Sequence, residues 1–136
     1  MLNRDGIRKT TYGAPRQILA NVEHQYSVGC IVPASMGPTT ATNGVKLVKA
    51  GTPININLSD TNTAVKAPAA AGTGTTAVPM NAVLLHDVDV TDGDANGTAL
   101  IFGFVNLNRL ETDVVTKITT AQGITGASPL LTFVKL

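Results

Sequence analysis

Turn-forming residues interrupt this chain so often that the apolar segments between them are too short for ordinary helices through most of its length. The turns of the first half combine glycine, which permits positive φ, with proline, which fixes φ; they are Gly37-Pro38, Asn43-Gly44 and Gly51-Thr-Pro53. Tyr26–Val32 and Ile54-Asn-Ile-Asn-Leu58 are the clearest apolar runs beside these turns. The second run alternates apolar and polar residues, which is the period of a half-buried strand. We therefore expect short β-strands joined by tight turns.

Residues 78–107 carry the strongest strand signal. Ala82–Leu85 leads into the turn residues Asp92–Gly97, and Ala99–Val105 returns. Two apolar runs around a short Asp/Asn/Gly stretch are typical of a β-hairpin. Because both runs are continuous rather than alternating, we expect these strands to be buried on both faces, with Phe102 and Phe104 in the core.

One helix is expected, near the C-terminus. Asn108 is the predicted N-cap, and Glu111 lies three residues later, as in a capping box. The apolar stripe at helical spacing consists of Leu110, Val114, Ile118 and Ala121. Gly123 ends the helix, and Leu130–Leu136 is a closing strand. The predicted fold class is mainly β (α+β), a small β-rich domain with one short helix near the C-terminus.

The first 20 residues form a basic segment with no sustained apolar period. Four basic residues stand against the single acid Asp5. We expect an extended N-terminal arm over residues 1–20 and one β-rich domain over residues 21–136. The arm is either a solvated terminus or an element that binds a partner. In the second interpretation, the binding residues are Arg4, Arg8, Lys9, Tyr12 and Arg16.

Charged residues make up only 14% of the chain, and the net charge is +1. No global field therefore draws the protein to nucleic acid or to a membrane. Aromatic residues make up 4%, which leaves no stacking platform for bases. No apolar run reaches the roughly 18 residues of a membrane-spanning helix. The start of the chain lacks the apolar stretch of a secretory signal, so we expect synthesis in the cytoplasm.

The segment Asp92-Gly-Asp94-Ala-Asn96-Gly97 matches the first half of a calcium-binding loop. Alternating carboxylate and amide oxygens suit a hard cation, and Asp92, Asp94 and Asn96 are the candidate ligands. The twelfth position, where a bidentate glutamate closes such a site, is Gly103. Asp and Asn are also common in turns because they bond their own backbone. The turn interpretation is favoured, and we expect no metal and no cofactor.

The remaining candidates for chemistry are isolated. Cys30 lies in an apolar run and is expected to be a small buried residue. His24 and His86 have no metal-ligand spacing, and Asp87 and Asp89 are interpreted as the solvated end of a strand. Ala64–Gly74 shows neither the helical nor the strand period of apolar residues, so we expect it to be an exposed loop. Its glycines lack the lysine and the following helix of a phosphate-binding loop. The sequence thus predicts a protein that is not an enzyme.

Three segments, in this order, resemble the phage head decoration (capsid cement) protein family. They are Val45-Lys-Leu-Val-Lys-Ala-Gly-Thr-Pro53, Asn81-Ala-Val-Leu-Leu-His-Asp-Val-Asp-Val-Thr-Asp-Gly-Asp94 and Ala99-Leu-Ile-Phe-Gly-Phe-Val105. The Gly123-Ile124 pair and the final strand are similar to the family's closing elements. The likeness covers about residues 45–136. The chain departs from the family at Leu84, where glycine is more usual, and in its longer region before residue 45.

This resemblance implies a virion structural protein that binds the outer surface of a tailed-phage head and stabilises it. The implied partners are the major capsid protein and further copies of the chain in a homotrimer, without catalysis. The implied location is the capsid exterior. Alternatives are another virion subunit, such as a head fibre or tail tube, or a carbohydrate-binding β module. The module is disfavoured because Phe102, Phe104 and Phe133 lie in expected core strands.

Overall fold

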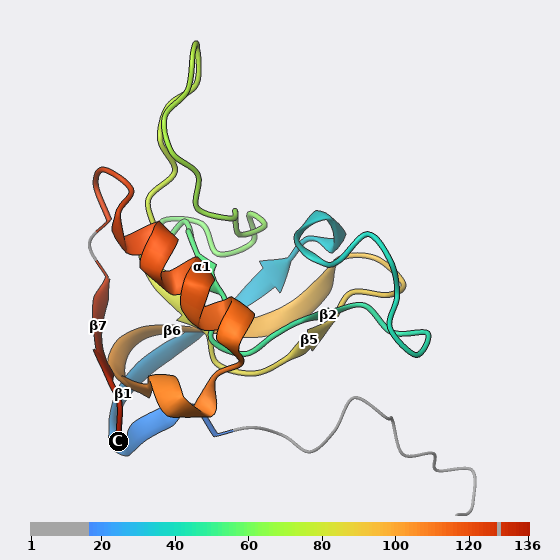
Figure 1. Ribbon diagram of the computed structural model, residues 1–136. Coiled ribbons are helices and arrows are strands. Elements are labelled where there is room, and N and C mark those ends of the chain that lie inside the picture. The colour runs from blue at the N-terminus through green and yellow to red at the C-terminus, as the bar shows by residue number, and fades with distance from the viewer. Residues whose placement is uncertain (1–16, 128) are drawn as a thin grey trace, which may run out of the picture.

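The computed structural model describes residues 17–127 and 129–136 and confirms the predicted fold class, mainly β with one helix near the C-terminus (Figure 1). The main sheet contains, in spatial order, β1 (Leu19–Val32), β6 (Ala95–Asn106), β4 (Ala82–Leu84) and β3 (Pro53–Ile54), with β7 (Leu130–Val134) beside β6. A small second sheet pairs β2 (Leu47–Val48) with β5 (Val88–Asp89). The helices are the 3-10 turns η1 (Ala34–Met36) and η2 (Leu107–Arg109) and the α-helix α1 (Thr112–Gln122).

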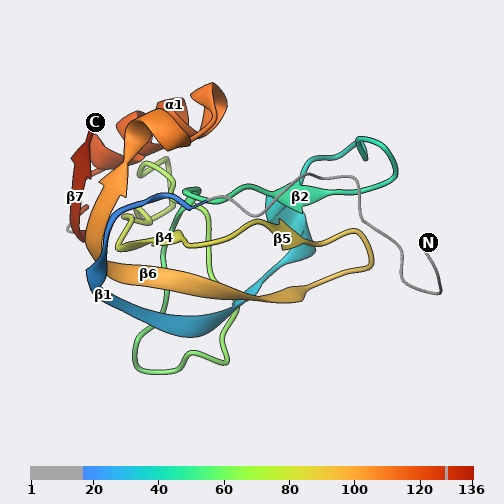
Figure 2. The same cartoon turned by 90° about the horizontal axis from the view of Figure 1, so that it is seen from below.

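The long strand β6 organises the sheet. It runs antiparallel to β1 along most of its length and antiparallel to β4, where Val83 faces Leu100. The predicted hairpin between residues 82 and 105 is therefore confirmed. β7 returns parallel to the end of β6, from Phe102 opposite Leu130 onward. α1 lies on one side of this sheet (Figure 2).

Two apolar cores occupy the opposite faces of the central strands. Val83 and Leu100 belong to the first core, which contains the apolar stripe of α1. Ala82 and Leu84 belong to the second, with residues from β1, β2 and β3. Successive residues of a strand point to opposite faces, so each of these strands contributes to both cores. This confirms the prediction of strands buried on both faces.

The expectation that Phe102 and Phe104 lie in the core is wrong. In the pairing with β1, Tyr26 faces Phe102 whereas the next residue, Ser27, faces Leu100. β6 therefore contains one extra residue, a β-bulge, which reverses the alternation of its side chains. Beyond the bulge Val105 points into the first core, and both phenylalanines are exposed on the opposite face.

The helix was predicted in the right place but with the wrong cap. The side chain of Asn106, not Asn108, accepts a hydrogen bond, and its donor is the backbone N–H of Asn108 at the start of η2. α1 begins only at Thr112, with Glu111 at the N-cap making no side-chain cap bond. The stripe is confirmed, since Leu110, Val114, Ile118 and Ala121 are all buried. The helix ends before Gly123, as expected.

The β domain includes residues before the expected boundary at residue 21. Ile18 is fully buried and Leu19 opens β1. The last residues of the expected arm are therefore part of the β domain. β1 still ends before Pro33, as its sequence indicated.

The segment expected to be an exposed loop is a narrow ribbon. Ala69 pairs with Val78 and Gly72 with Thr75, so the chain rises from the body and turns back at its tip (Figure 1). Most of its side chains are exposed, as predicted, but Val65 at its base is 2% exposed and joins the second core. The alternation expected for the strand Ile54–Leu58 stops before its end. Ile54 and Ile56 are buried, whereas Leu58 is exposed.

The turn at Gly51 brings the backbone against the first core. Its φ of +89° is a conformation that favours glycine, and a Cβ placed there would lie 2.5 Å from a methyl carbon of Leu110 and 3.2 Å from one of Val114. Gly44, in the turn after Asn43, has a similar φ of +78° but nothing within 4 Å. The two glycines therefore separate the cost of backbone strain from the cost of crowding.

We predict that Gly51→Ala lowers the free energy of unfolding by about 2–4 kcal/mol, from strain at positive φ together with overpacking. Gly44→Ala, the matched control, is expected to cost only the strain, about 1–2 kcal/mol. Urea unfolding followed by circular dichroism measures both. Equal losses in the two variants would show that Gly51 is not held by close packing.

Candidate functional site

The predicted capsid-binding residues Arg4, Arg8, Lys9, Tyr12 and Arg16 lie outside the described residues. What the structure describes is where the segment joins the domain. Ile18 is buried in the first core, and its carbonyl oxygen accepts a hydrogen bond from the N–H of Asn106. The point of attachment is thus anchored at the end of β6.

The turn Lys49-Ala-Gly-Thr52 connects the segments on which the family resemblance rests. The N–H of Ala50 donates to the carboxylate of Asp87 at 2.7 Å, and the N–H of Gly51 donates to the carbonyl of Leu84 at 2.7 Å. The Thr52 hydroxyl donates back to the Lys49 carbonyl. Asp87 is therefore a partner of a buried N–H rather than the solvated strand end that its sequence suggested. These residues shape the fold by joining the turn to the second segment.

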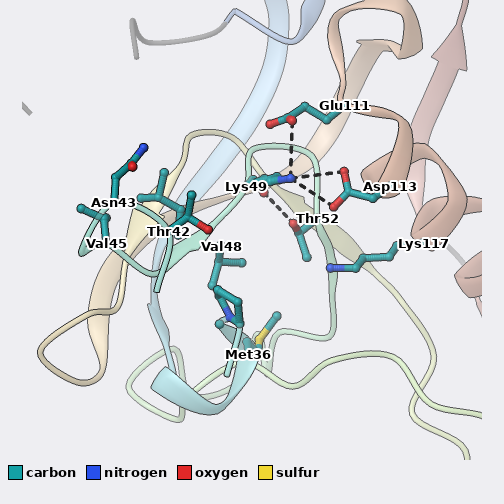
Figure 3. Close-up of a pocket in the computed structure, with 13 residues that line it drawn as sticks. Met36, Thr42, Asn43, Val45, Val48, Lys49, Thr52, Glu111, Asp113 and Lys117 are labelled. Carbon is teal, nitrogen blue, oxygen red and sulfur yellow. Dashed lines mark hydrogen bonds and ion pairs between the residues drawn. The ribbon is translucent and has the colours of Figure 1, made fainter. Parts of the chain in front are cut away.

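A groove of about 680 Å³ opens beside this turn, between the segment around Met36 and the start of α1. Figure 3 shows Lys49 between Glu111 and Asp113, with Lys117 reaching in from the next turn of the helix. The Lys49 Nζ lies 3.4 Å from Glu111 Oε1 and 3.2 Å from Asp113 Oδ2. The opposite wall is largely uncharged, so the groove contains equal numbers of acidic and basic groups and selects no ligand by charge.

The ion cluster shifts the pKa values of its members. Burial acts to raise the pKa of Asp113, but the hydrogen bond and charge of Lys49 and the charge of Lys117 outweigh it, and the pKa is lowered. Burial likewise acts to lower the pKa of Lys49, but Asp113 and Glu111 prevail and raise it. The side chains are 38% to 53% exposed, so each pair contributes well under about 1 kcal/mol. The cluster ties the turn to the helix.

The candidate metal loop is used as a turn. Asp94 Oδ1 accepts a hydrogen bond of 2.9 Å from the N–H of Ala34 and so holds η1 beside the start of β6. Asp92 is exposed, and Asn96 already belongs to β6, opposite Ile31. Over residues 17–127 and 129–136, no three His, Cys, Asp or Glu side chains gather as metal ligands would.

The structure does not bring Cys30 and the histidines into a reactive arrangement. Cys30 is 5% exposed in the second core, as predicted, and burial raises the pKa of its thiol against a weaker opposing hydrogen bond from the Gly97 backbone. A raised pKa disfavours the nucleophilic thiolate. His24 and His86 are exposed, on β1 and on the segment between β4 and β5.

An exposed apolar surface, which the sequence analysis did not predict, lies across β1, β6 and β7. It is on the face of the sheet opposite the first core, which contains the apolar stripe of α1. Tyr26, Phe102, Phe104 and Leu130 are all exposed there. The sequence Phe102-Gly-Phe104 alternates two large residues with one that is small, the period of a strand with one face outward. That signal was available, but the continuous apolar run before it concealed the change.

Comparison with known proteins gave no match to a family model, to a curated protein or to a solved structure. In the part of the chain that the structure describes, no helix is long and apolar enough to cross a membrane.

We predict that calcium does not stabilise the protein, because Asp94 already accepts a backbone hydrogen bond and Gly103 replaces the closing carboxylate. Thermal melting in millimolar calcium and in chelator should give the same midpoint. A rise of several degrees with calcium would contradict the turn interpretation, since a ligand that binds the folded state must stabilise it.

We predict that Asp113→Asn lowers the free energy of unfolding by about 0.5 kcal/mol or less at neutral pH and low salt. The pKa of Asp113 is lowered by folding, so its contribution is present above the ordinary value of 3.8 and is lost as pH falls through the folded value. The difference from the unsubstituted protein should therefore vanish in strong acid and shrink in high salt.

The matched control for this test is Asp92→Asn, which removes the same charge from an exposed turn away from α1. Urea unfolding at several pH values measures both variants. If Asp92→Asn shows the same pH-dependent loss as Asp113→Asn, the effect comes from net charge and not from the ion cluster.

Proposed function

We propose that this protein is a phage head decoration protein, which binds the outer surface of a tailed-phage head and stabilises the shell. The partners in this proposal are the major capsid protein and further copies of the chain, arranged as a homotrimer. The protein performs no catalysis and requires no cofactor. It is made in the host cytoplasm and acts on the capsid exterior.

The observation that carries the proposal is the ordered set of segments that resembles the decoration family. In the structure these segments support one another. The Lys49–Thr52 turn bonds to Leu84 and Asp87 of the second segment, and β4 of that segment pairs with β6, which contains the third. A likeness that falls on mutually dependent positions is stronger support than the same number of scattered matches.

The distribution of charge supports a binding role for the N-terminal arm. Residues 1–16 contain four basic groups and one acid, whereas the whole chain has a net charge of only +1. The rest of the chain is therefore slightly acidic, and the first 16 residues hold four of the ten basic groups. Such a segment suits a partner surface rich in carboxylates, with which arginine forms bidentate pairs. An extended chain can also add backbone hydrogen bonds to an exposed strand.

One observation favours the carbohydrate-binding alternative more than the sequence did. Phe102 and Phe104 are on the surface beside Tyr26, where the sequence had placed both phenylalanines in the core. Aromatic rings on an exposed sheet face can stack on sugars as well as on protein. The alternative of a head fibre or tail-tube subunit is distinguished by the position of the protein on the particle, which electron microscopy of labelled virions shows.

We predict that deletion of residues 1–16 leaves the domain folded and weakens binding to undecorated heads about tenfold or more, because ion pairs and backbone hydrogen bonds to the shell are lost. Sedimentation of protein with heads measures the affinity, and circular dichroism checks the fold. Binding of the full chain should weaken with salt, though only partly, because apolar contacts are not screened.

A second variant separates the contribution of the arm's charges to binding from the contribution of its backbone. Replacing Arg4, Arg8, Lys9 and Arg16 with glutamine keeps the length and removes the ion pairs. It should bind with intermediate affinity and lose most of the salt dependence. If the deletion variant saturates heads with unchanged affinity, the arm is only a terminus; if the full chain does not bind heads at all, the proposed function is wrong.

A further inference from the structure

Two rows of side chains cross three neighbouring strands on the outer face of the sheet. Tyr26, Phe102 and Leu130 are direct neighbours across β1, β6 and β7, and Asn21, Phe104 and Thr132 form the next row. Between the rows β1 contains the irregular residues 22–25, where β6 advances by only two residues. We call these six side chains the aromatic face. Its apolar members come from three strands, so their relative positions are set by the sheet.

The aromatic face is large for a chain of this size. Tyr26 is 60% exposed, Phe102 45%, Phe104 36% and Leu130 66%. If a large apolar side chain offers about 150–250 Å², these four expose on the order of 400 Å². A typical protein interface covers about 800 Å² on each partner. The four side chains therefore supply about half of one partner's share, and the polar neighbours can supply the rim.

The placement of these rings does not serve the packing of the chain itself. The chain has five aromatic residues, of which Tyr12 lies outside the described part. Three of the other four are on the aromatic face, and only Phe133 packs against a core. Both cores are otherwise built from aliphatic side chains, methionine and cysteine. Aromatic residues with few charges among them are the usual composition of an interface centre.

We propose that the aromatic face is the surface through which copies of this chain associate. Where a surface meets its own equivalent across a symmetry axis, each charge lies near its own copy unless the two are offset, so an uncharged face avoids this repulsion. None of the six side chains of the face is charged, and the nearest acidic residue in the irregular stretch of β1 is the exposed Glu23. In a ring of three copies each face is directed toward the axis and meets the other two.

The edge of β7 offers backbone hydrogen-bonding groups next to this contact. Among the described strands, β7 pairs with β6 alone, so one side of its backbone is open next to Leu130. An open edge beside an apolar face is a natural place for a second chain to add. The inference rests on the proposed function only for the number of copies, because association of free chains in solution does not require a capsid.

The test is sedimentation of the full chain and of a double variant, Phe102→Thr with Phe104→Thr, which keeps residues that favour strands. The unsubstituted protein should sediment as an oligomer of its 14.0 kDa chain. The double variant should be monomeric, or dissociate at a concentration about tenfold higher or more, with an unchanged circular dichroism spectrum. The matched control is Leu58→Thr, which removes an even more exposed apolar side chain from outside the face.

A second variant covers the case in which the double variant fails to fold. Leu130→Arg places one charge on a side chain that is 66% exposed, and around a symmetry axis these charges repel. It should also dissociate the oligomer. The proposal is overturned if the full chain is monomeric at high micromolar concentration or if the folded variants keep the oligomer. It is also overturned if the variants remain oligomeric and lose only binding to heads or to a glycan, since the face then serves that partner instead. Head binding by the separate arm variants tests the proposed function independently.

Discussion

The close approach of one backbone turn to the helix is the contact on which the rest of this structure depends. Gly51 has no side chain, which lets the chain pass directly beneath Leu110 and Val114. On its other side the same turn is bonded to β4 through Leu84 and to the following segment through Asp87. The ion pairs of Lys49 with Glu111 and Asp113 lie at the exposed rim of this contact. The sheet, the turn and the helix are thus held in one arrangement by a few buried hydrogen bonds and close packing, with the charges as a minor addition.

The β-bulge in β6 divides the protein into a packed part and a part available for partners. Before the bulge, Ala99, Leu100 and Ile101 are buried between the two cores. After it, Val105 packs in the first core, whereas Phe102 and Phe104 are exposed. One extra residue therefore converts a strand buried on both faces into a strand with an outward face. The aromatic face is a consequence of this local geometry and of the parallel addition of β7.

The two proposed interactions use different parts of the molecule and different physics. The arm is basic, so the contacts proposed for it are partly electrostatic and would weaken with salt. The aromatic face is uncharged, so the contacts proposed for it are apolar and would depend on shape. Because Ile18 is anchored to Asn106 at the end of β6, the arm departs from the same end of the sheet at which β7 and the aromatic face lie. Assembly of copies would therefore place several arms near one another and increase the effective concentration of binding segments.

Local pattern alone determined much of this protein. The turns at Gly37, Asn43-Gly44 and Gly51, the hairpin between residues 82 and 105 and the apolar stripe of α1 all depend on neighbours a few residues apart, whose conformational preferences are visible in the order of residues. The tertiary structure alone decided the bulge that exposes Phe102 and Phe104, the parallel pairing of β7 and the use of Asp87 and Asp94 as backbone acceptors. Each of these joins residues distant in the chain or adds a residue to a strand, and the free energy that selects them comes from packing and hydrogen bonds formed only when the whole sheet is assembled.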